Sequence, residues 1–251
     1  NLCFFLVLGL ASVPQPQRTA RHTVVGIEGR EFVVNGAPTY VGRSNDGMRI
    51  QGLLFNSRMV QGIFDDRNPE TRGRWNYPDG PWDPERNTRE FIAAMPLWKA
   101  KGLLAFTINL QGGSPEGYSR SQPWVSSSFE TDGRPRPDYL SRLERILDRA
   151  DQLGMVAIVG FFYQGQERRM DDESSVTRAA EAATDWLIDK GYTNVLVEVA
   201  NEADNAGFKH DVIKPSGGAV QLIERLKARS KNRVASPAGR LLVSTSLNGG
   251  R

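Results

Sequence analysis

The sequence predicts an α/β fold in which amphipathic helices alternate with buried, parallel strands. Four glycines each stand directly before a strand-like apolar run: Gly102, Gly154, Gly191 and Gly239. Glycine adopts the left-handed conformation that ends a helix at little cost, so each glycine predicts a helix end followed by a strand. The runs are almost continuously apolar, which is typical of strands buried on both faces of a parallel sheet.

The first predicted elements are a hairpin and a strand. Residues 31–40 (EFVVNGAPTY) predict a β-hairpin that turns at Asn35 and Gly36, because Asn-Gly is favoured in two-residue hairpin turns. The hairpin leads into the first parallel strand, which we expect at residues 39–44. Residues 46–86 then form a long connection, and loops of that length are usually functional.

Four helices and four further strands fill the rest of the sequence. We expect the first helix from Phe91 to Lys101, opened by a capping box at residues 87–90 and kinked at Pro96. The other three show one apolar face at three- and four-residue spacing: 139–153, 176–190 and 219–228. The remaining strands are expected at 103–110, 155–162, 194–200 and 240–247.

Five parallel strands fit either a complete doubly wound sheet or part of a (β/α)8 barrel. A doubly wound nucleotide-binding sheet carries a glycine-rich phosphate loop, and the sequence contains neither GxGxxG nor GxxxxGK(S/T). The sequence also stops directly after a predicted strand, at residues 248–251. We therefore expect an incomplete (β/α)8 TIM barrel, with about five of eight βα units and an N-terminal β-hairpin.

The composition excludes several classes of protein. The 251 residues are 39% apolar and 24% charged, which is typical of a folded domain and not of a disordered chain. The net charge of +3 comes from dispersed arginines without a basic stripe, so we expect no nucleic-acid partner. One cysteine, Cys3, and two histidines, His22 and His210, argue against a Cys/His metal site. We predict no metal, no cofactor and no protein partner.

The first residues resemble a secretory signal. Residues 2–10 are wholly apolar, and small residues at Gly9 and Ala11 match a cleavage site, although the initiator Met and a basic segment are absent. A buried N-terminal helix or strand is the alternative. We expect residues 1–17 to be the remnant of a signal peptide and residues 18–251 to be the N-terminal part of the barrel, in a secreted or periplasmic protein. No apolar run is long enough to span a membrane, so no membrane association is expected after signal removal.

The strand expected at 194–200 ends in an amide and a carboxylate. Its sequence, VLVEVANE, places Asn201 and Glu202 at the carboxyl end, where barrel enzymes keep their catalytic groups. Glu198 shares a face with Glu202 because side chains alternate along a strand. A buried acid needs a partner, for which we expect an arginine such as Arg43. The alternative for Glu202 is an ordinary loop acid paired with an arginine.

The segment VLVEVANEADN resembles the fourth-strand motif of clan A glycoside hydrolases, especially the family 5 cellulase-like enzymes. Glu198, Asn201, Glu202 and Asn205 fall on matching positions, and residues 32–44 are similar to the hairpin and first strand that open many such barrels. The resemblance implies that residues 18–251 belong to a catalytic barrel, that Glu202 is the general acid/base, and that Asn201 contacts the sugar 2-hydroxyl. It also implies a retaining mechanism whose nucleophile ends a seventh strand, outside this sequence.

The sequence departs from that pattern at three places. Ala203 replaces the usual proline, the second strand lacks an arginine at its end, and the third lacks a histidine. Two alternatives therefore stay open. One is an inverting hydrolase or lyase that uses Asp46, Glu116 or Glu167 together with Glu202. The other is a non-catalytic carbohydrate-binding or scaffold barrel.

A carbohydrate is the expected partner. Aromatic rings stack on the C–H faces of sugars, and amide or hydroxyl groups at strand ends bond sugar hydroxyls. The side chains predicted to bind substrate are Asn45, Trp82, Gln111, Trp124, Tyr163, Gln164, Asn205 and His210. For each ring alone, packing against the barrel is the alternative.

Overall fold

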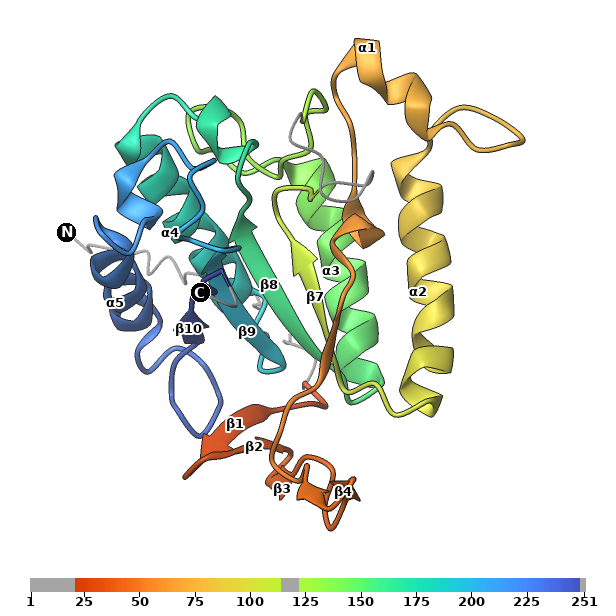
Figure 1. The fold of residues 1–251 in the computed structure, drawn as a ribbon, viewed down its shortest axis with the longest axis vertical. Helices are drawn as coiled ribbons and strands as arrows, with labels where there is room; N and C mark the ends of the chain where they lie inside the picture. The colour runs from red at the N-terminus through yellow and green to blue at the C-terminus, as the bar shows by residue number, and fades with distance from the viewer. Residues whose placement is uncertain (1–20, 114–121, 249–251) are drawn as a thin grey trace, which may run out of the picture.

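The computed structural model describes residues 21–113 and 122–248, so the expected signal segment lies outside the described residues. Its centre is a five-stranded parallel sheet with strand order β10-β9-β8-β7-β6 (Figure 1). The strands are β6 (Asn56–Arg58), β7 (Ala105–Asn109), β8 (Val156–Phe162), β9 (Val195–Ala200) and β10 (Leu242–Ser244).

Each strand lies beside the one that precedes it in the sequence. Right-handed crossovers in this order place every connecting helix on the same face of the sheet, whereas a doubly wound sheet reverses direction partway. The helices are α2 (Pro84–Ala100), α3 (Pro137–Gln152), α4 (Glu173–Asp189) and α5 (Ala219–Ser230). Helix α2 packs against α3, and α4 packs against α5. This is the topology of an open arc of a (β/α)8 barrel, as predicted.

The main core lies between the sheet and the helices. In α3, the predicted apolar face is buried: Leu140, Leu143, Ile146, Leu147 and Ala150. Strands β7 and β8 are almost entirely buried, which confirms the reading of their continuous apolar runs.

The predicted helix-ending glycines are confirmed for three helices. Gly102, Gly154 and Gly191 follow α2, α3 and α4 with φ values of +89°, +65° and +71°. Gly239 also has a positive φ, but α5 already ends at Ser230, so this glycine belongs to the loop before β10.

Helix α2 begins earlier than predicted. Asp83 is its N-cap, and its carboxylate accepts hydrogen bonds from the backbone N–H groups of Glu85 (2.8 Å) and Arg86 (3.0 Å). The expected capping box at residues 87–90 lies inside the helix. The helix continues through Pro96 to Ala100.

The predicted first parallel strand at 39–44 is wrong. Positive φ angles at Tyr40 and Gly42 make this segment a series of turns, followed by a two-stranded ribbon of β4 (Ser44–Asn45) and β5 (Met48–Arg49). The first parallel strand is β6, which pairs with β7. Its sequence, NSR, is short and polar, so it carries no apolar run by which a buried strand is recognised.

An antiparallel sheet closes the amino ends of the parallel strands. It consists of β1 (Val25–Glu28), β2 (Glu31–Val34) and β3 (Ala37–Pro38), and the predicted turn at Asn35 and Gly36 joins β2 to β3. The backbone N–H of Val25 donates to the carbonyl of Thr193, just before β9, over 2.9 Å. Figure 1 shows this sheet and the β4–β5 ribbon at one end of the molecule.

Short helical turns lie in the connections: η1 (Val60–Ile63), α1 (Pro69–Arg72), η2 (Gly73–Trp75), η3 (Glu167–Arg169) and η4 (Asp211–Ile213). Within residues 21–113 and 122–248, no helix has the length and apolar character that crossing a membrane requires.

Candidate active site

Strand β9 delivers Asn201 and Glu202 to the carboxyl edge of the sheet. The strand ends at Ala200, and the backbone N–H of Asn201 donates to the carbonyl of Phe162 at the end of β8, over 3.1 Å. Asn201 is buried, whereas Glu202 is half-buried. The two residues therefore occupy the predicted place, with the carboxylate accessible.

An arginine fixes the orientation of the Asn201 amide. Arg58, the last residue of β6, donates a short hydrogen bond from Nη1 to Oδ1 of Asn201. A guanidinium has no acceptor, so it must face the amide oxygen. The Nδ2 group of Asn201 points the other way and donates to Oε1 of Gln164 over 3.4 Å. The guanidinium also lies 5.8 Å from the ring centre of Tyr163.

Glu202 adopts an unusual backbone conformation, with a φ of +54°. Its N–H donates to Oγ of Ser246 over 2.9 Å, and its carbonyl accepts from the N–H of Asn205 over 2.7 Å. The Asn205 side chain also reaches the Glu202 carboxylate, with 3.5 Å between Nδ2 and Oε2. Asn205 thus lies beside the predicted acid/base.

Glu198 lies in a row of residues across the sheet. It pairs in register with Gly160 of β8, which pairs with Asn109 of β7. A Cβ atom at Gly160 would overlap Oδ1 of Asn109 and lie 3.3 Å from Oε2 of Glu198, so the glycine lets the two side chains approach each other. Asn109 is fully buried, and neither polar atom of its amide has a hydrogen-bond partner in the described part of the chain.

Burial raises the pKa of the Glu198 carboxyl above its ordinary value. The Ser246 hydroxyl and the charge of Arg58 oppose this shift, and the negative charge of Glu202 adds to it. The arginine near Glu198 is thus Arg58, and the expectation of Arg43 is wrong, because that residue lies in the turns before the β4–β5 ribbon.

Three of the residues that define this edge were not predicted: Arg58, Asn109 and Ser246. Asn109 ends an apolar strand run, and Ser246 follows β10, so their positions at strand ends were a usable signal. Arg58 carried no such signal because its strand was not recognised.

Two predicted substrate contacts are wrong because of where the fold places them. Asn45 belongs to the exposed β4–β5 ribbon, near the amino ends of the parallel strands and opposite to Glu202. Trp124 is fully buried, and its ring packs edge-on against Trp75 with 5.8 Å between centroids. It is a core residue of the loops and cannot stack on a sugar.

His210 is a further correction. Its side chain is only 4% exposed, and Nδ1 makes a short hydrogen bond with the fully buried carboxylate of Glu167. The backbone N–H groups of Lys209 and His210 also donate to that carboxylate, over 2.9 and 2.8 Å. The pair fastens the loop after β8 to the loop after β9.

The acids considered for an inverting mechanism do not lie opposite Glu202 in the described residues. Glu167 is buried beneath His210, and Asp46 lies in the turn of the β4–β5 ribbon. Glu116 lies outside the described residues.

The other predicted substrate contacts described in this paragraph differ in how far they are buried. Gln111 is buried, and its amide links the N–H of Tyr163 (3.1 Å) to Oγ of Ser127 (3.4 Å), so it positions the strand ends. Gln164 is half-buried beside Asn201. Trp82 is half-buried in the connection before α2, where its ring stacks on Tyr77 with 5.6 Å between centroids.

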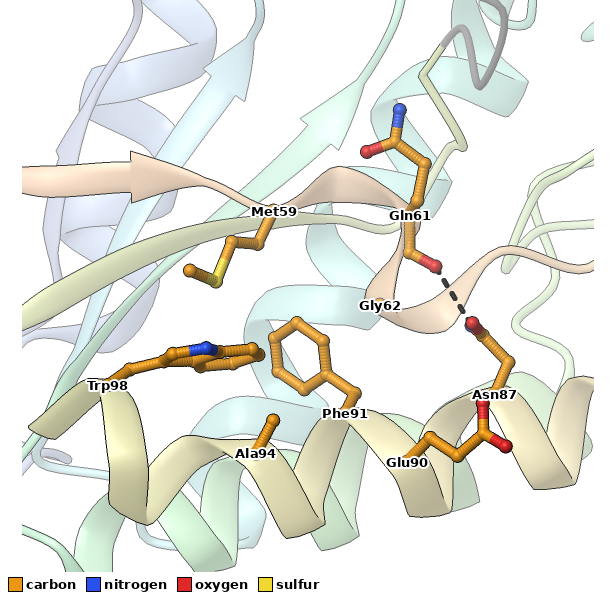
Figure 2. A pocket seen from close by; sticks show the side chains of 8 residues that line it. All are labelled: Met59, Gln61, Gly62, Asn87, Glu90, Phe91, Ala94 and Trp98. Atoms are coloured by element: carbon orange, nitrogen blue, oxygen red, sulfur yellow. Dashed lines mark hydrogen bonds between the residues drawn. The ribbon is translucent and has the colours of Figure 1, made fainter.

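A pocket of about 420 Å³ lies between α2 and the segment that follows β6. Figure 2 shows Phe91 and Trp98 of α2 facing Met59, while Asn87 donates to the carbonyl of Gln61 over 2.9 Å. The pocket is mainly apolar and does not include the carboxyl-edge residues. No group of three or more His, Cys, Asp and Glu side chains in the described ranges is arranged to hold a metal ion.

No protein-family model and no curated protein matches this sequence. Solved structures resemble it at low identity. A glycoside hydrolase family 5 mannosidase from Rhizomucor miehei shows 13% identity and a TM-score of 0.47, over 92% of this chain and 57% of that one. An endo-1,4-beta-mannanase from Eisenia fetida shows 14% identity and a TM-score of 0.45, over 88% of this chain and 61% of that one. A glycoside hydrolase family 5 protein from Bacteroides vulgatus shows 12% identity and a TM-score of 0.44, over 88% of this chain and 39% of that one. The chain thus spans between 39% and 61% of these structures.

Proposed function

We propose that this chain is part of a retaining glycoside hydrolase in which Glu202 is the general acid/base. The observation that carries the proposal is the end of β9: a half-buried carboxylate at the carboxyl edge of a barrel-type sheet, next to a buried amide whose orientation an arginine fixes. Barrel enzymes place their catalytic groups at this edge.

The arrangement suits the chemistry of glycosidic bonds. Cleavage passes through an oxocarbenium-like transition state and needs a proton donor at the leaving oxygen. Glu202 is accessible for that role. Because Arg58 occupies Oδ1 of Asn201, the Nδ2 group faces Gln164 at a long distance of 3.4 Å and is the donor left for a sugar hydroxyl. Such a bond strengthens as charge develops on the sugar.

A retaining mechanism needs a second carboxylate about 5–5.5 Å from the first. Glu198 is nearby, but it lies inside β9, in register with Gly160 of β8, and not beyond the carboxyl end of the strand. We therefore assign the nucleophile to a residue outside these 251. Residues 18–251 would then be the N-terminal part of the catalytic barrel, and residues 1–17 the remnant of a signal for secretion or export to the periplasm.

Side chains near Glu202 would contact the sugar. Gln164 bonds Asn201 and Asn205 bonds Glu202, both from half-buried positions, and Trp82 offers a half-buried ring. Tyr163 is buried beside Arg58, so it offers little surface to a sugar. A poly- or oligosaccharide fits this combination of amides and aromatic faces.

The test is Glu202→Gln in the longest natural chain that contains this sequence. The amide keeps the size of the side chain but cannot donate a carboxylic proton, so turnover of an unactivated glycoside should fall about 10²- to 10⁴-fold. A nitrophenyl glycoside needs little protonation, so its cleavage should lose less rate. Added azide should restore breakdown of the glycosyl-enzyme, because the anion attacks the sugar without a general base and displaces the enzyme carboxylate as a glycosyl azide forms. Glu224→Gln, at an exposed position of α5, is the matched control.

Two results would contradict the proposal. Full activity of Glu202→Gln would remove the acid/base assignment. Binding of oligosaccharides without hydrolysis by the unsubstituted protein would support a non-catalytic carbohydrate-binding barrel instead.

A further inference from the structure

A buried carboxylate–imidazole pair joins the two loops that border the candidate site. Glu167 belongs to η3, in the loop after β8, and its side chain is completely buried. His210 lies in the loop after β9, and Nδ1 of its ring makes a short hydrogen bond with Oε1 of Glu167. Nε2 of the same ring is buried and has no hydrogen-bond partner in the described residues. The bond to Glu167 therefore orients the ring, although neither side chain of this buried pair takes part in the proposed reaction.

The carboxylate of the buried pair also binds the backbone of the second loop. Oε2 of Glu167 accepts from the N–H of Lys209 over 2.9 Å, and Oε1 accepts from the N–H of His210 over 2.8 Å. Because both oxygens accept backbone protons, Nδ1 of His210 is the donor to the carboxylate. A glutamine amide has one acceptor oxygen and one NH₂ group, so it could not satisfy donors on both sides.

The first of the two loops carries Gln164. The N–H groups of Gln166 and Glu167 both donate to the carbonyl of Tyr163, over 3.1 and 3.0 Å, so a tight turn connects Gln164 to the buried pair. Oε1 of Gln164 accepts from Nδ2 of Asn201 over 3.4 Å. The place of Glu167 therefore helps to set where Gln164 lies beside Asn201.

The second loop carries Asn205, which bonds the Glu202 carboxylate. Oδ1 of Asn205 accepts from the N–H of Gly207 over 2.8 Å, and its carbonyl accepts from the N–H of Phe208 over 3.2 Å. The next residue is Lys209, whose N–H donates to the buried pair. A Cβ atom at Gly207 would lie 3.1 Å from Cβ of Gln164, so the two loops contact each other directly.

We propose that the two members of the buried pair are positioning residues, which hold Gln164 and Asn205 in place to bind the sugar. Glu202 has a separate support, because its N–H donates to Oγ of Ser246 over 2.9 Å. Loss of the buried pair should therefore weaken substrate binding more than it slows proton transfer. The role in substrate binding rests on the proposed function, whereas the hold on the two loops does not.

Glu173 supplies a matched control for Glu167. It is exposed at the start of α4, and its carboxylate accepts from the N–H groups of Asp211 and Val212 over 2.8 and 2.9 Å. Glu173 therefore binds the same loop through two backbone hydrogen bonds, but farther along the chain from Asn205. The change from Glu to Gln at each position separates the buried pair from loop fastening in general.

The first test measures amide hydrogen exchange by mass spectrometry in the longest natural chain that contains this sequence. In Glu167→Gln, an NH₂ group opposes a backbone donor, so peptides covering 163–167 and 203–210 should exchange about tenfold faster. Peptides from α3 should stay protected. Glu173→Gln should accelerate exchange mainly in 211–218. Unchanged exchange at 203–210 in Glu167→Gln would overturn the proposal.

Two variants of His210 provide the test if Glu167→Gln does not fold. His210→Ala removes the donor to the carboxylate, so exchange at 203–210 should accelerate. His210→Asn supplies a side-chain N–H close to the position of Nδ1 and should restore much of the protection. Wild-type protection in His210→Ala, or no difference between the two variants, would show that the ring does not hold the loops.

The kinetic test uses the same proteins and a nitrophenyl glycoside. Loosened contacts from Gln164 and Asn205 should raise KM of Glu167→Gln about three- to tenfold and change kcat less than about twofold. Glu173→Gln should leave both constants unchanged. Faster exchange with an unchanged KM, or an equal rise of KM in Glu173→Gln, would contradict the positioning role. If the unsubstituted protein hydrolyses no glycoside, the proposed function fails, and the exchange results still decide whether the buried pair holds the loops.

Discussion

Arg58 shows how one side chain organises the carboxyl edge. It donates to Oδ1 of Asn201 and lies over the ring of Tyr163, and its charge lowers the pKa of Glu198 against the larger effect of burial. A lysine is a point charge without the planar fork, so it would not hold the amide in the same way. The orientation of Asn201 is therefore a consequence of a residue on the far edge strand of the sheet.

Glu198 should give the folded chain a pH-dependent stability. Its pKa is raised in the folded state by burial, so its contribution to stability is complete below the unfolded-state pKa of about 4.3 and is lost as pH rises through the folded-state pKa. Glu198→Gln has no carboxyl to ionise, so it does not lose this stability. The difference in free energy of unfolding between the variant and the wild type should therefore grow in favour of the variant as pH rises, as measured by urea unfolding across a pH series.

The control is Glu224→Gln. The pKa of Glu224 is lowered by Lys227, so any contribution it makes is lost as pH falls, in the opposite sense. Parallel stability curves for wild type and Glu198→Gln would contradict the assignment of a raised pKa to this residue.

At the scale of elements, an aromatic cluster joins two long connections of the sheet. Phe64, after β6, contacts Trp75 and Trp82 edge-on at 5.2 and 5.9 Å, and Trp75 contacts Trp124 in the connection after β7. Of the two tryptophans predicted to line a sugar cleft, Trp124 instead joins these two loops. Trp82, the other of the two, is half-buried, so part of its ring stays exposed to a ligand.

Trp124→Ala should therefore destabilise the fold. Removing a fully buried tryptophan costs about 3–5 kcal/mol in free energy of unfolding, through lost burial and the cavity that remains. Trp82→Ala should cost less because its ring is half-buried, and should weaken oligosaccharide binding. Thermal and chemical unfolding of both variants, with oligosaccharide titration of the second, measures the difference. A stable Trp124→Ala that loses binding would restore this ring as a substrate contact.

At the scale of the whole molecule, the N-terminal sheet is fastened to the amino ends of the strands. Asp151, in α3, is buried, and its carboxylate accepts from the N–H groups of His22 (3.0 and 3.1 Å) and Thr23 (2.9 Å). The backbone N–H of Val25, in β1, adds a second link by donating to the carbonyl of Thr193 just before β9. The carboxyl edge, where the candidate site lies, stays open to solvent at Glu202.

Asp151→Ala should loosen this closure without unfolding the barrel core. Each unsatisfied buried donor costs about 1–3 kcal/mol, so amide hydrogen exchange in β1 and β2 should accelerate while β8 stays protected. Asp171→Ala, at an exposed position before α4, should change neither. Uniform acceleration across all strands would show instead that the N-terminal sheet and the barrel core unfold as one unit.

The sequence by itself determined most of the helices and strands and the placement of Asn201 and Glu202, because these depend on local properties. Apolar spacing defines a helix face, glycine ends a helix, and a motif fixes which residues follow a strand. The tertiary structure alone decided which side chains contact each other across the site. Arg58 meets Asn201 across 143 residues of chain, and His210 meets Glu167 across 43. Such contacts depend on how the strands align and how the loops pack, which no local pattern contains. Loop packing also buries Trp124, and the turns before β4 place Asn45 at the opposite end of the sheet, and neither outcome follows from a local pattern.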